Sequence, residues 1–94
     1  MMYVRLECSV DRLGPMVLSW RRIINETSHY VATGKLIMVN DKRMSLLTST
    51  ASSSLLITLV RAEDAGQYVC EVSSSPPVHM THWIKIKGDS KQTL

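Results

Sequence analysis

The sequence contains no phenylalanine, and two tryptophans and three tyrosines are its only aromatic side chains. No apolar stretch approaches the roughly 20 residues that a membrane-spanning helix needs, so the sequence predicts no such helix. Like charges do not gather in long runs and the net charge is only +3, which gives little support for nucleic-acid binding. No long run has the period of an amphipathic helix either. These absences favour a small domain built from strands.

Catalytic and metal-binding patterns are also missing. Serines and histidines are plentiful, but the sequence has neither a nucleophile elbow nor a paired-carboxylate pattern. His79 and His82 are three positions apart, a spacing that places them on opposite faces of a strand, where they cannot easily share a metal ion. We therefore expect no enzyme, no metal site and no cofactor.

The size of the chain and its cysteine count limit the fold further. A chain of 94 residues has room for one domain, and an apolar content of 45% can supply a core. A domain this small is usually only marginally stable without further support. Cys8 and Cys70 are the two cysteines, and an even count in a small domain suggests one disulfide and an oxidising compartment. Two buried free thiols in a reducing compartment fit the count equally well.

Short runs of alternating apolar and polar residues make up most of the chain. Residues 24–29 and 48–54 are polar and predict loops, while Gly34 predicts the turn of a short hairpin. The eight candidate strands cover residues 3–10, 16–23, 30–32, 35–39, 43–47, 55–60, 63–70 and 78–87. Many short strands at close spacing, with turn residues between them, are typical of an all-β sandwich or barrel.

One motif narrows the fold class. The stretch "DAGQYVC" (64–70) places an acid, a glycine, a tyrosine and a cysteine at every second position, which is the period of a strand. Trp20 follows Cys8 by 12 residues. A cysteine, a tryptophan on the next strand and a later D-x-G-x-Y-x-C resemble the hallmark of the immunoglobulin sandwich. The sequence therefore predicts an immunoglobulin-like β-sandwich of the V/I-set, with two antiparallel sheets and with the strand A region missing.

The resemblance implies a structural role for each residue of the motif. Cys8 and Cys70 are expected to join the two sheets by a disulfide, with Trp20 packed against it. The Tyr68 hydroxyl is expected to bond to the backbone of the preceding corner, and Gly66 to permit a close approach of the chain near that corner.

Asp64 is the unusual inward residue of the motif, because a buried carboxylate needs a partner. Arg43 resembles the arginine that pairs with this aspartate at the foot of variable-type domains. Its fork of donors matches a carboxylate. We expect Arg43 and Asp64 to form an ion pair.

A narrower resemblance covers residues 4–87. The segments "LECSV", "VLSW", "ATGKLIMVNDKRMSLL" and "LLITLVRAEDAGQYVCEVS" are similar to the first domain of neuronal adhesion proteins of the lachesin, amalgam and klingon type, which are related to the vertebrate IgLON group. This resemblance implies an extracellular recognition domain, secreted or at the cell surface, that binds another immunoglobulin-type protein, either a second copy of itself or a different one. It implies no nucleic acid and no small-molecule substrate.

Two departures from the family pattern accompany this resemblance. The strands that precede the first cysteine strand in the family are missing, and residues 21–30 are longer than expected between two neighbouring strands. We expect residues 1–88 to form the domain, truncated at its N-terminal strand, and 89–94 to be a tail or linker. A signal peptide and a membrane anchor are expected to lie outside this segment.

Alternation predicts which residues of one sheet face outward. With Trp20 and Cys70 inward, and Ile84 and Ile86 in the core, an apolar strip with charged neighbours should form the partner-binding face. An isolated exposed tryptophan is the simpler alternative. The predicted face consists of Ile23, Arg21, Val69, Glu71, Trp83 and Lys85.

The sequence also contains a candidate modification site and is compatible with more than one function. Asn25 begins an N-x-T triplet in a polar loop and is a candidate for N-glycosylation. The function has two alternatives to adhesion: a structural spacer domain of a larger extracellular or muscle-type chain, which should have a polar face, and an immune-type receptor domain, which would bind through its loops.

Overall fold

The computed structural model describes residues 2–86 and consists of strands with one turn of 3-10 helix, η1 (Ala62–Asp64). The strands are β1 (Tyr3–Ser9), β2 (Leu18–Ile24), β3 (Thr27–Thr33), β4 (Leu36–Ile37), β5 (Met44–Thr48), β6 (Ser52–Thr58), β7 (Gly66–Val72) and β8 (Val78–Ile84). No helix in this part of the chain is long and apolar enough to cross a membrane.

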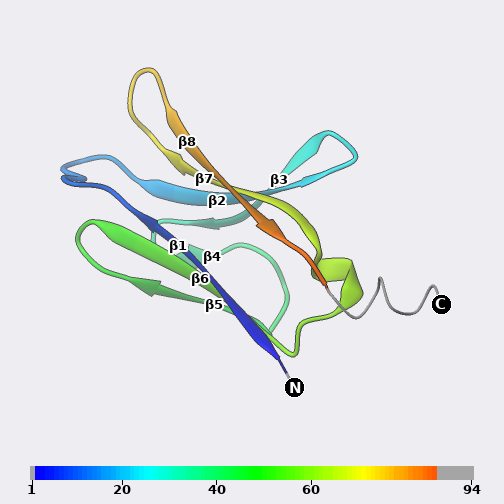
Figure 1. The fold of residues 1–94 in the computed structure, drawn as a ribbon. Helices are drawn as coiled ribbons and strands as arrows, with labels where there is room; N and C mark the ends of the chain where they lie inside the picture. Colours follow the sequence, from blue (N-terminus) through cyan, green and yellow to red (C-terminus); the bar gives the residue numbers. More distant parts are fainter. Residues whose placement is uncertain (1, 87–94) are drawn as a thin grey trace.

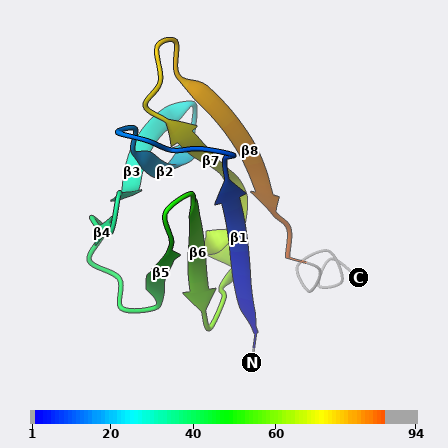
Figure 2. The ribbon, with the colours of Figure 1, turned by 90° about the vertical axis from the view of Figure 1, so that its left-hand side faces the viewer.

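The strands form two antiparallel sheets that pack as layers (Figure 1). The order is β1-β6-β5 in the three-stranded sheet and β4-β3-β2-β7-β8 in the five-stranded sheet. Between residues 2 and 86, β1 pairs only with β6 and β8 only with β7, so each keeps one edge without a strand partner. Figure 2 shows these two strands bordering the same side of the sandwich.

The structure corrects two predicted loops. Residues 27–29 belong to β3, so the β2–β3 connection is a two-residue turn in which Asn25 has a φ of 50° and Glu26 a φ of 66°. Positive φ at both central positions matches the twist of the flanking strands. Residues 52–54 belong to β6, where all three serines pair with β1. Neither strand end could be recognised from its composition, because both are polar. Residues 27–29 lie at an exposed hairpin tip, and residues 52–54 pair with β1 through their backbone.

The core lies between the sheets and contains the predicted disulfide. Cys8 and Cys70 are bonded across a sequence separation of 62 residues. Trp20 is the direct cross-strand neighbour of Cys70 and is 1% exposed. Its indole Nε1 donates a hydrogen bond of 3.0 Å to the Oγ of Ser53, a buried hydroxyl in the opposite sheet. A tryptophan can be buried so completely because its only polar atom has found an acceptor.

The corner before β7 has the tyrosine hydrogen bond that the motif predicts, but the strand predicted over 63–70 begins only at Gly66, because residues 62–64 form η1. The Tyr68 hydroxyl donates a 2.7 Å hydrogen bond to the backbone carbonyl of Asp64. Gly66 is needed for a different reason from the one expected. A Cβ at this position would meet nothing within 4 Å, but its φ of 131° is a conformation that side chains disfavour. The constraint is therefore on the backbone and not on space.

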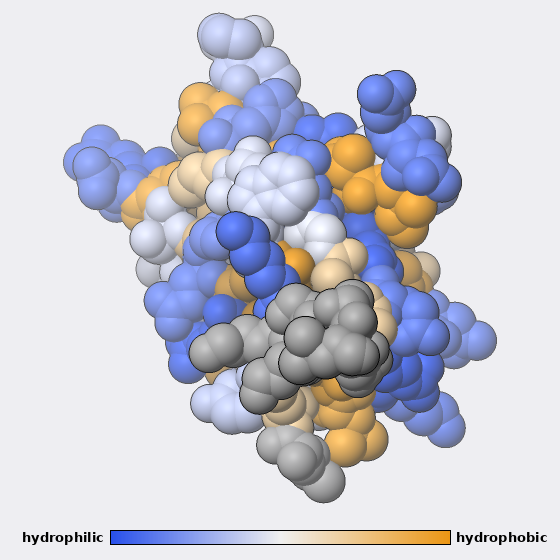
Figure 3. Space-filling view, turned by 45° about the vertical axis from the view of Figure 1, so that its right-hand side comes forward, coloured by the Kyte–Doolittle hydropathy of each residue, from blue (hydrophilic) through white to orange (hydrophobic). Residues whose placement is uncertain are grey.

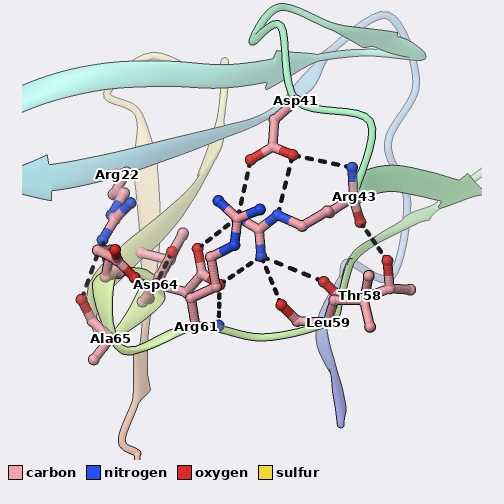
Figure 4. Close-up of polar contacts among 10 residues, drawn as sticks. Arg22, Asp41, Arg43, Thr58, Leu59, Arg61, Asp64 and Ala65 are labelled. Carbon is pink, nitrogen blue, oxygen red and sulfur yellow. Dashed lines mark hydrogen bonds and ion pairs between the residues drawn. The ribbon is translucent and has the colours of Figure 1, made fainter. Parts of the chain in front are cut away.

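Arg43 and Asp64 form the predicted ion pair, and Asp41 joins it (Figure 4). The Arg43 guanidinium donates to both carboxylate oxygens of Asp64, at 2.8 and 3.0 Å. It also donates to both oxygens of Asp41, at 3.2 and 2.9 Å. The Arg43 Nη1 that donates to Asp64 also donates to the backbone carbonyls of Thr58 and Leu59. One side chain therefore links the start of β5 to the end of β6 and to η1.

A second arginine supports the same corner. The Arg22 guanidinium donates to the backbone carbonyls of Glu63 and Ala65. It also lies over the ring of Tyr68, 5.4 Å from the ring centroid. A guanidinium on an aromatic face gains a cation–π attraction. Arg22 thus links β2 to the segment that contains Asp64 and Tyr68 of the motif.

The two carboxylates predict that the fold loses stability in acid. Hydrogen bonds from the Arg43 side chain lower the pKa of Asp64, and those from the Arg43 backbone and side chain lower the pKa of Asp41, below the ordinary 3.8. A carboxyl whose pKa is lower in the folded state stabilises the fold above its unfolded pKa and loses this effect as the pH falls through its folded pKa. The urea midpoint should therefore stay level from neutral pH to about pH 4 and fall below it.

The matched control is Asp41→Asn combined with Asp64→Asn, which removes both titrations. This variant should start from a lower urea midpoint and show a shallower fall in acid. Equal acid slopes in the two proteins would mean that other groups cause the effect.

Candidate partner-binding face

The outer face of the five-stranded sheet is defined by alternation and register. Trp20 and Cys70 point inward, so their neighbours along β2 and β7 point outward, and cross-strand partners share a face. One row across the sheet contains Ser28, Ile23, Gln67 and Trp83; the next contains Tyr30, Arg21, Val69 and Thr81; the third contains Thr33, Ser19, Glu71 and His79. We call these residues, together with Leu36 and Met38, the outer face.

Trp83 lies on this face as the sequence predicted. It pairs with Gln67 of β7, whose other partner is Ile23 of β2. The Trp83 side chain is 61% exposed, while Ile23 is half-buried. Lys85 is exposed and follows the end of β8.

Val69 differs from the expectation. It points outward but is only 6% exposed, so it is not an accessible part of an apolar strip. Val69 lies on a central strand between Arg21 of β2 and Thr81 of β8. Flanking side chains on both neighbouring strands cover a short valine, whereas a tryptophan on the edge strand rises above its neighbours.

Opposite charges are paired at the centre of the face. The Arg21 Nε lies 3.1 Å from a carboxylate oxygen of Glu71, and both side chains are 21% exposed. Arg21 also donates a 2.9 Å hydrogen bond to the Ser28 hydroxyl. The His79 Nε2 lies 3.7 Å from the same Glu71 oxygen. The centre is thus polar but already neutralised within the domain.

Three exposed apolar side chains lie on this face that the sequence analysis did not predict there. Tyr30 of β3 pairs with the outward Arg21, and Leu36 of β4 pairs with Thr33. Met38 lies beside the same threonine, whose hydroxyl is 3.3 Å from the methionine sulfur. Their exposures are 52% for Tyr30, 65% for Leu36 and 53% for Met38.

The cause of this omission is a register shift. The pairing of β2 with β3 slips between Trp20 and Arg21, so Val31 and Ala32 are both buried and Tyr30 turns outward. A bulge of this kind breaks the alternation on which the prediction depended. The predicted hairpin about Gly34 was a signal for Leu36 and Met38, because it places a further strand beside this face.

The arrangement gives two apolar flanks around a charge-paired centre. One flank is Trp83 on the β8 edge. The other consists of Tyr30 on β3, Leu36 on β4 and Met38 just after β4. Figure 3, which views one side of the molecule, shows hydrophobic and hydrophilic patches side by side with no single kind covering the surface. Aromatic and methionine side chains beside a polar centre are typical of protein–protein contact surfaces.

The two histidines of β8, His79 and His82, lie on opposite faces of that strand. His79 is on the outer face beside Glu71. His82 is on the inner face, where its ring centroid lies 5.5 Å from that of Trp20. Within residues 2–86 no group of three histidine, cysteine or acidic side chains is placed to hold a metal ion.

Comparisons with solved structures agree with this architecture. A chain from the structure of Dpr11 IG1 bound to DIP-gamma superposes with a TM-score of 0.82 at 26% identity, over 89% of this chain and 42% of that one. The structure of Dpr2 Ig1-Ig2 in complex with DIP-Theta Ig1-Ig3 gives 0.81 at 24% identity, over 89% and 38%. The RIG-5 IG1 homodimer gives 0.80 at 18% identity, over 90% and 82%.

The fold is therefore an immunoglobulin-like sandwich, similar at low sequence identity to the first immunoglobulin domains of the Dpr, DIP and RIG-5 proteins. The chain spans less than half the length of the first two of these chains. No protein-family model matches the sequence, and no curated protein matches it.

Proposed function

We propose that this domain is an extracellular recognition domain that binds another immunoglobulin-type domain through the outer face. The observation that carries the proposal is the pair of apolar flanks on one sheet. Trp83 on one edge and Leu36 on the other are each more than half exposed, and both belong to the same face. Several exposed apolar side chains gathered on one face favour a binding surface, whereas a spacer domain should have a polar face.

The chemistry of the face suits a protein partner. Tryptophan and tyrosine anchors bury much apolar area and retain a polar atom, and they are frequent among the residues that contribute most to binding. Arg21 and Glu71 are paired in charge within the domain, although the buried Arg21 Nε makes no hydrogen bond. Because the charges are paired, their desolvation on docking is less costly than that of an unpaired charge. A partner needs apolar side chains opposite the flanks and a polar centre between them.

The similar structures support an immunoglobulin-type partner. They include Dpr11 IG1 bound to DIP-gamma, a RIG-5 IG1 homodimer and a ZIG-8–RIG-5 IG1–IG1 heterodimer. The sequence resemblance to lachesin, amalgam and klingon favours the same assignment, to neuronal-type surface adhesion. The disulfide favours an oxidising compartment and hence an extracellular location. We propose a secreted or cell-surface protein whose partner is a second copy of this domain or a different immunoglobulin-type domain.

The proposal predicts a large effect of Trp83→Ala. Loss of such an anchor commonly costs 2 kcal/mol or more, which is roughly a thirtyfold loss of affinity. The secreted domain is first screened, as a multimer, against immunoglobulin-type ectodomains that include itself. Surface plasmon resonance on the resulting pair should then show this loss of affinity for Trp83→Ala. Tyr30→Ala should also weaken binding.

The matched control is Tyr3→Ala, an exposed aromatic on the outer side of β1 in the other sheet. It should leave affinity within about twofold. Val69 is unsuitable as a test position because its burial makes a charged substitution a threat to the fold. Equal losses for Tyr3→Ala and Trp83→Ala, or no binding in the screen, would favour the spacer assignment.

A further inference from the structure

The tip of the β2–β3 hairpin contains an exposed acceptor triplet. Asn25, Glu26 and Thr27 form an N-x-T triplet whose middle residue is not proline. All three residues are exposed, as are their neighbours Ile24 and Ser28. Asn25 and Glu26 are the two central residues of the turn, so the asparagine side chain projects from the end of the hairpin.

The disulfide is an independent observation that points to the same modification. A bonded Cys8–Cys70 pair fits a protein that folds in the secretory pathway or another oxidising compartment. In eukaryotes the secretory pathway is also where asparagine side chains receive oligosaccharides. An exposed triplet in a disulfide-bonded domain is therefore in the right compartment and in an accessible place.

We propose that Asn25 carries an N-linked oligosaccharide at the tip of the β2–β3 hairpin, and that this oligosaccharide borders the outer face without covering it. In the transfer, the Asn25 Nδ2 loses a proton and forms a bond to the anomeric carbon of an oligosaccharide held on a lipid pyrophosphate. The bond between that carbon and the pyrophosphate oxygen breaks, and the lipid pyrophosphate leaves. The Thr27 hydroxyl is the feature by which a transferase recognises the triplet.

The register of the sheet gives the position of the sugar relative to the outer face. Along β2, Arg21 lies four residues before Asn25, which is about 13 Å at ~3.3 Å per residue. The third row, which contains Ser19 and Thr33 beside Leu36, is a further two residues away. Trp83 lies two strands across from β2, roughly 10 Å in the hydrogen-bonding direction. The oligosaccharide leaves from the end of the sheet, beyond the Ile23–Gln67–Trp83 row.

Mass analysis of the secreted chain tests the attachment. Trypsin should release residues 23–35, because Arg22 and Lys35 flank the triplet. We expect this peptide to carry sugar that peptide-N-glycosidase removes, leaving an aspartate at position 25 that is labelled when the reaction runs in ¹⁸O water. Asn25→Gln and Thr27→Ala should abolish the signal, while Thr27→Ser and the neighbouring control Ser28→Ala should keep it. An unmodified wild-type peptide from secreting eukaryotic cells would overturn the proposal.

Radical footprinting tests the position without any binding partner. Side-chain oxidation of Trp83, Tyr30 and Met38 should agree within about twofold between the glycosylated and the enzyme-treated protein. Trp83 is in the row nearest the tip but two strands across from β2, and Tyr30 and Met38 lie farther from the tip along the sheet. Protection of Trp83 or Met38 by the sugar would show that it covers the face. The importance of this position for docking rests on the proposed function, but both readouts are independent of it. A failed partner screen therefore does not affect them.

Discussion

Replacing Arg43 with methionine should lower the free energy of unfolding by about 3–5 kcal/mol, which is the usual cost of leaving a buried charge without its partner. The Asp64 side chain is only 3% exposed and the Arg43 side chain 12% exposed. Without the guanidinium, the Asp64 carboxylate keeps only a 2.7 Å hydrogen bond from the backbone N–H of Arg61. The same variant removes the contacts to the carbonyls of Thr58 and Leu59. Urea unfolding at neutral pH, followed by tryptophan fluorescence, measures the change.

The network also predicts that its two partners are unequal. Asp64→Asn should cost less than Arg43→Met, about 1–3 kcal/mol, because Arg43 keeps the bidentate contact with Asp41 and the carbonyl contacts. In Arg43→Lys the charge remains but the fork of donors is lost, so its stability should lie between those of wild type and Arg43→Met. Equal losses for the arginine and aspartate variants would contradict the central position of Arg43.

Removing the disulfide should have an effect of similar size. For a loop of 62 residues, the chain-entropy model gives a stabilisation of about 4 kcal/mol, since the bond restricts the unfolded chain. The double variant Cys8→Ala and Cys70→Ala also loses buried sulfur atoms beside Trp20, because both cysteines are at most 3% exposed. The urea midpoint of this variant should fall far below that of the oxidised wild type.

Reduced wild-type protein is the matched control, because it keeps both sulfur atoms and loses only the bond. Its midpoint should lie between those of the oxidised wild type and the double alanine variant. Mass measurement after alkylation, with and without prior reductant, reports the state of the two thiols. Two alkylated thiols in unreduced secreted protein, or an unchanged midpoint after reduction, would contradict the expected contribution.

The sequence alone determined the fold class and most of the core. Strand alternation places Gly66, Tyr68 and Cys70 on one side of β7, whereas Asp64 is buried at the end of η1, outside the strand. The resemblance of this motif to the immunoglobulin pattern implied Cys8 as the partner of Cys70 and Arg43 as the partner of Asp64. The second pairing also agrees with the need of a buried carboxylate for a cation.

The tertiary structure decided which residues of the outer face are accessible. Alternation gave the side on which Val69 and Trp83 lie, but their exposures of 6% and 61% depend on whether neighbouring strands flank them on both sides or on one. The register shift between β2 and β3 turned Tyr30 outward, and the hairpin at Gly34 added Leu36 beside it. Burial and register arise from contacts between strands distant in sequence. The strands themselves could therefore be predicted from local periodicity, whereas the accessible shape of the face could not.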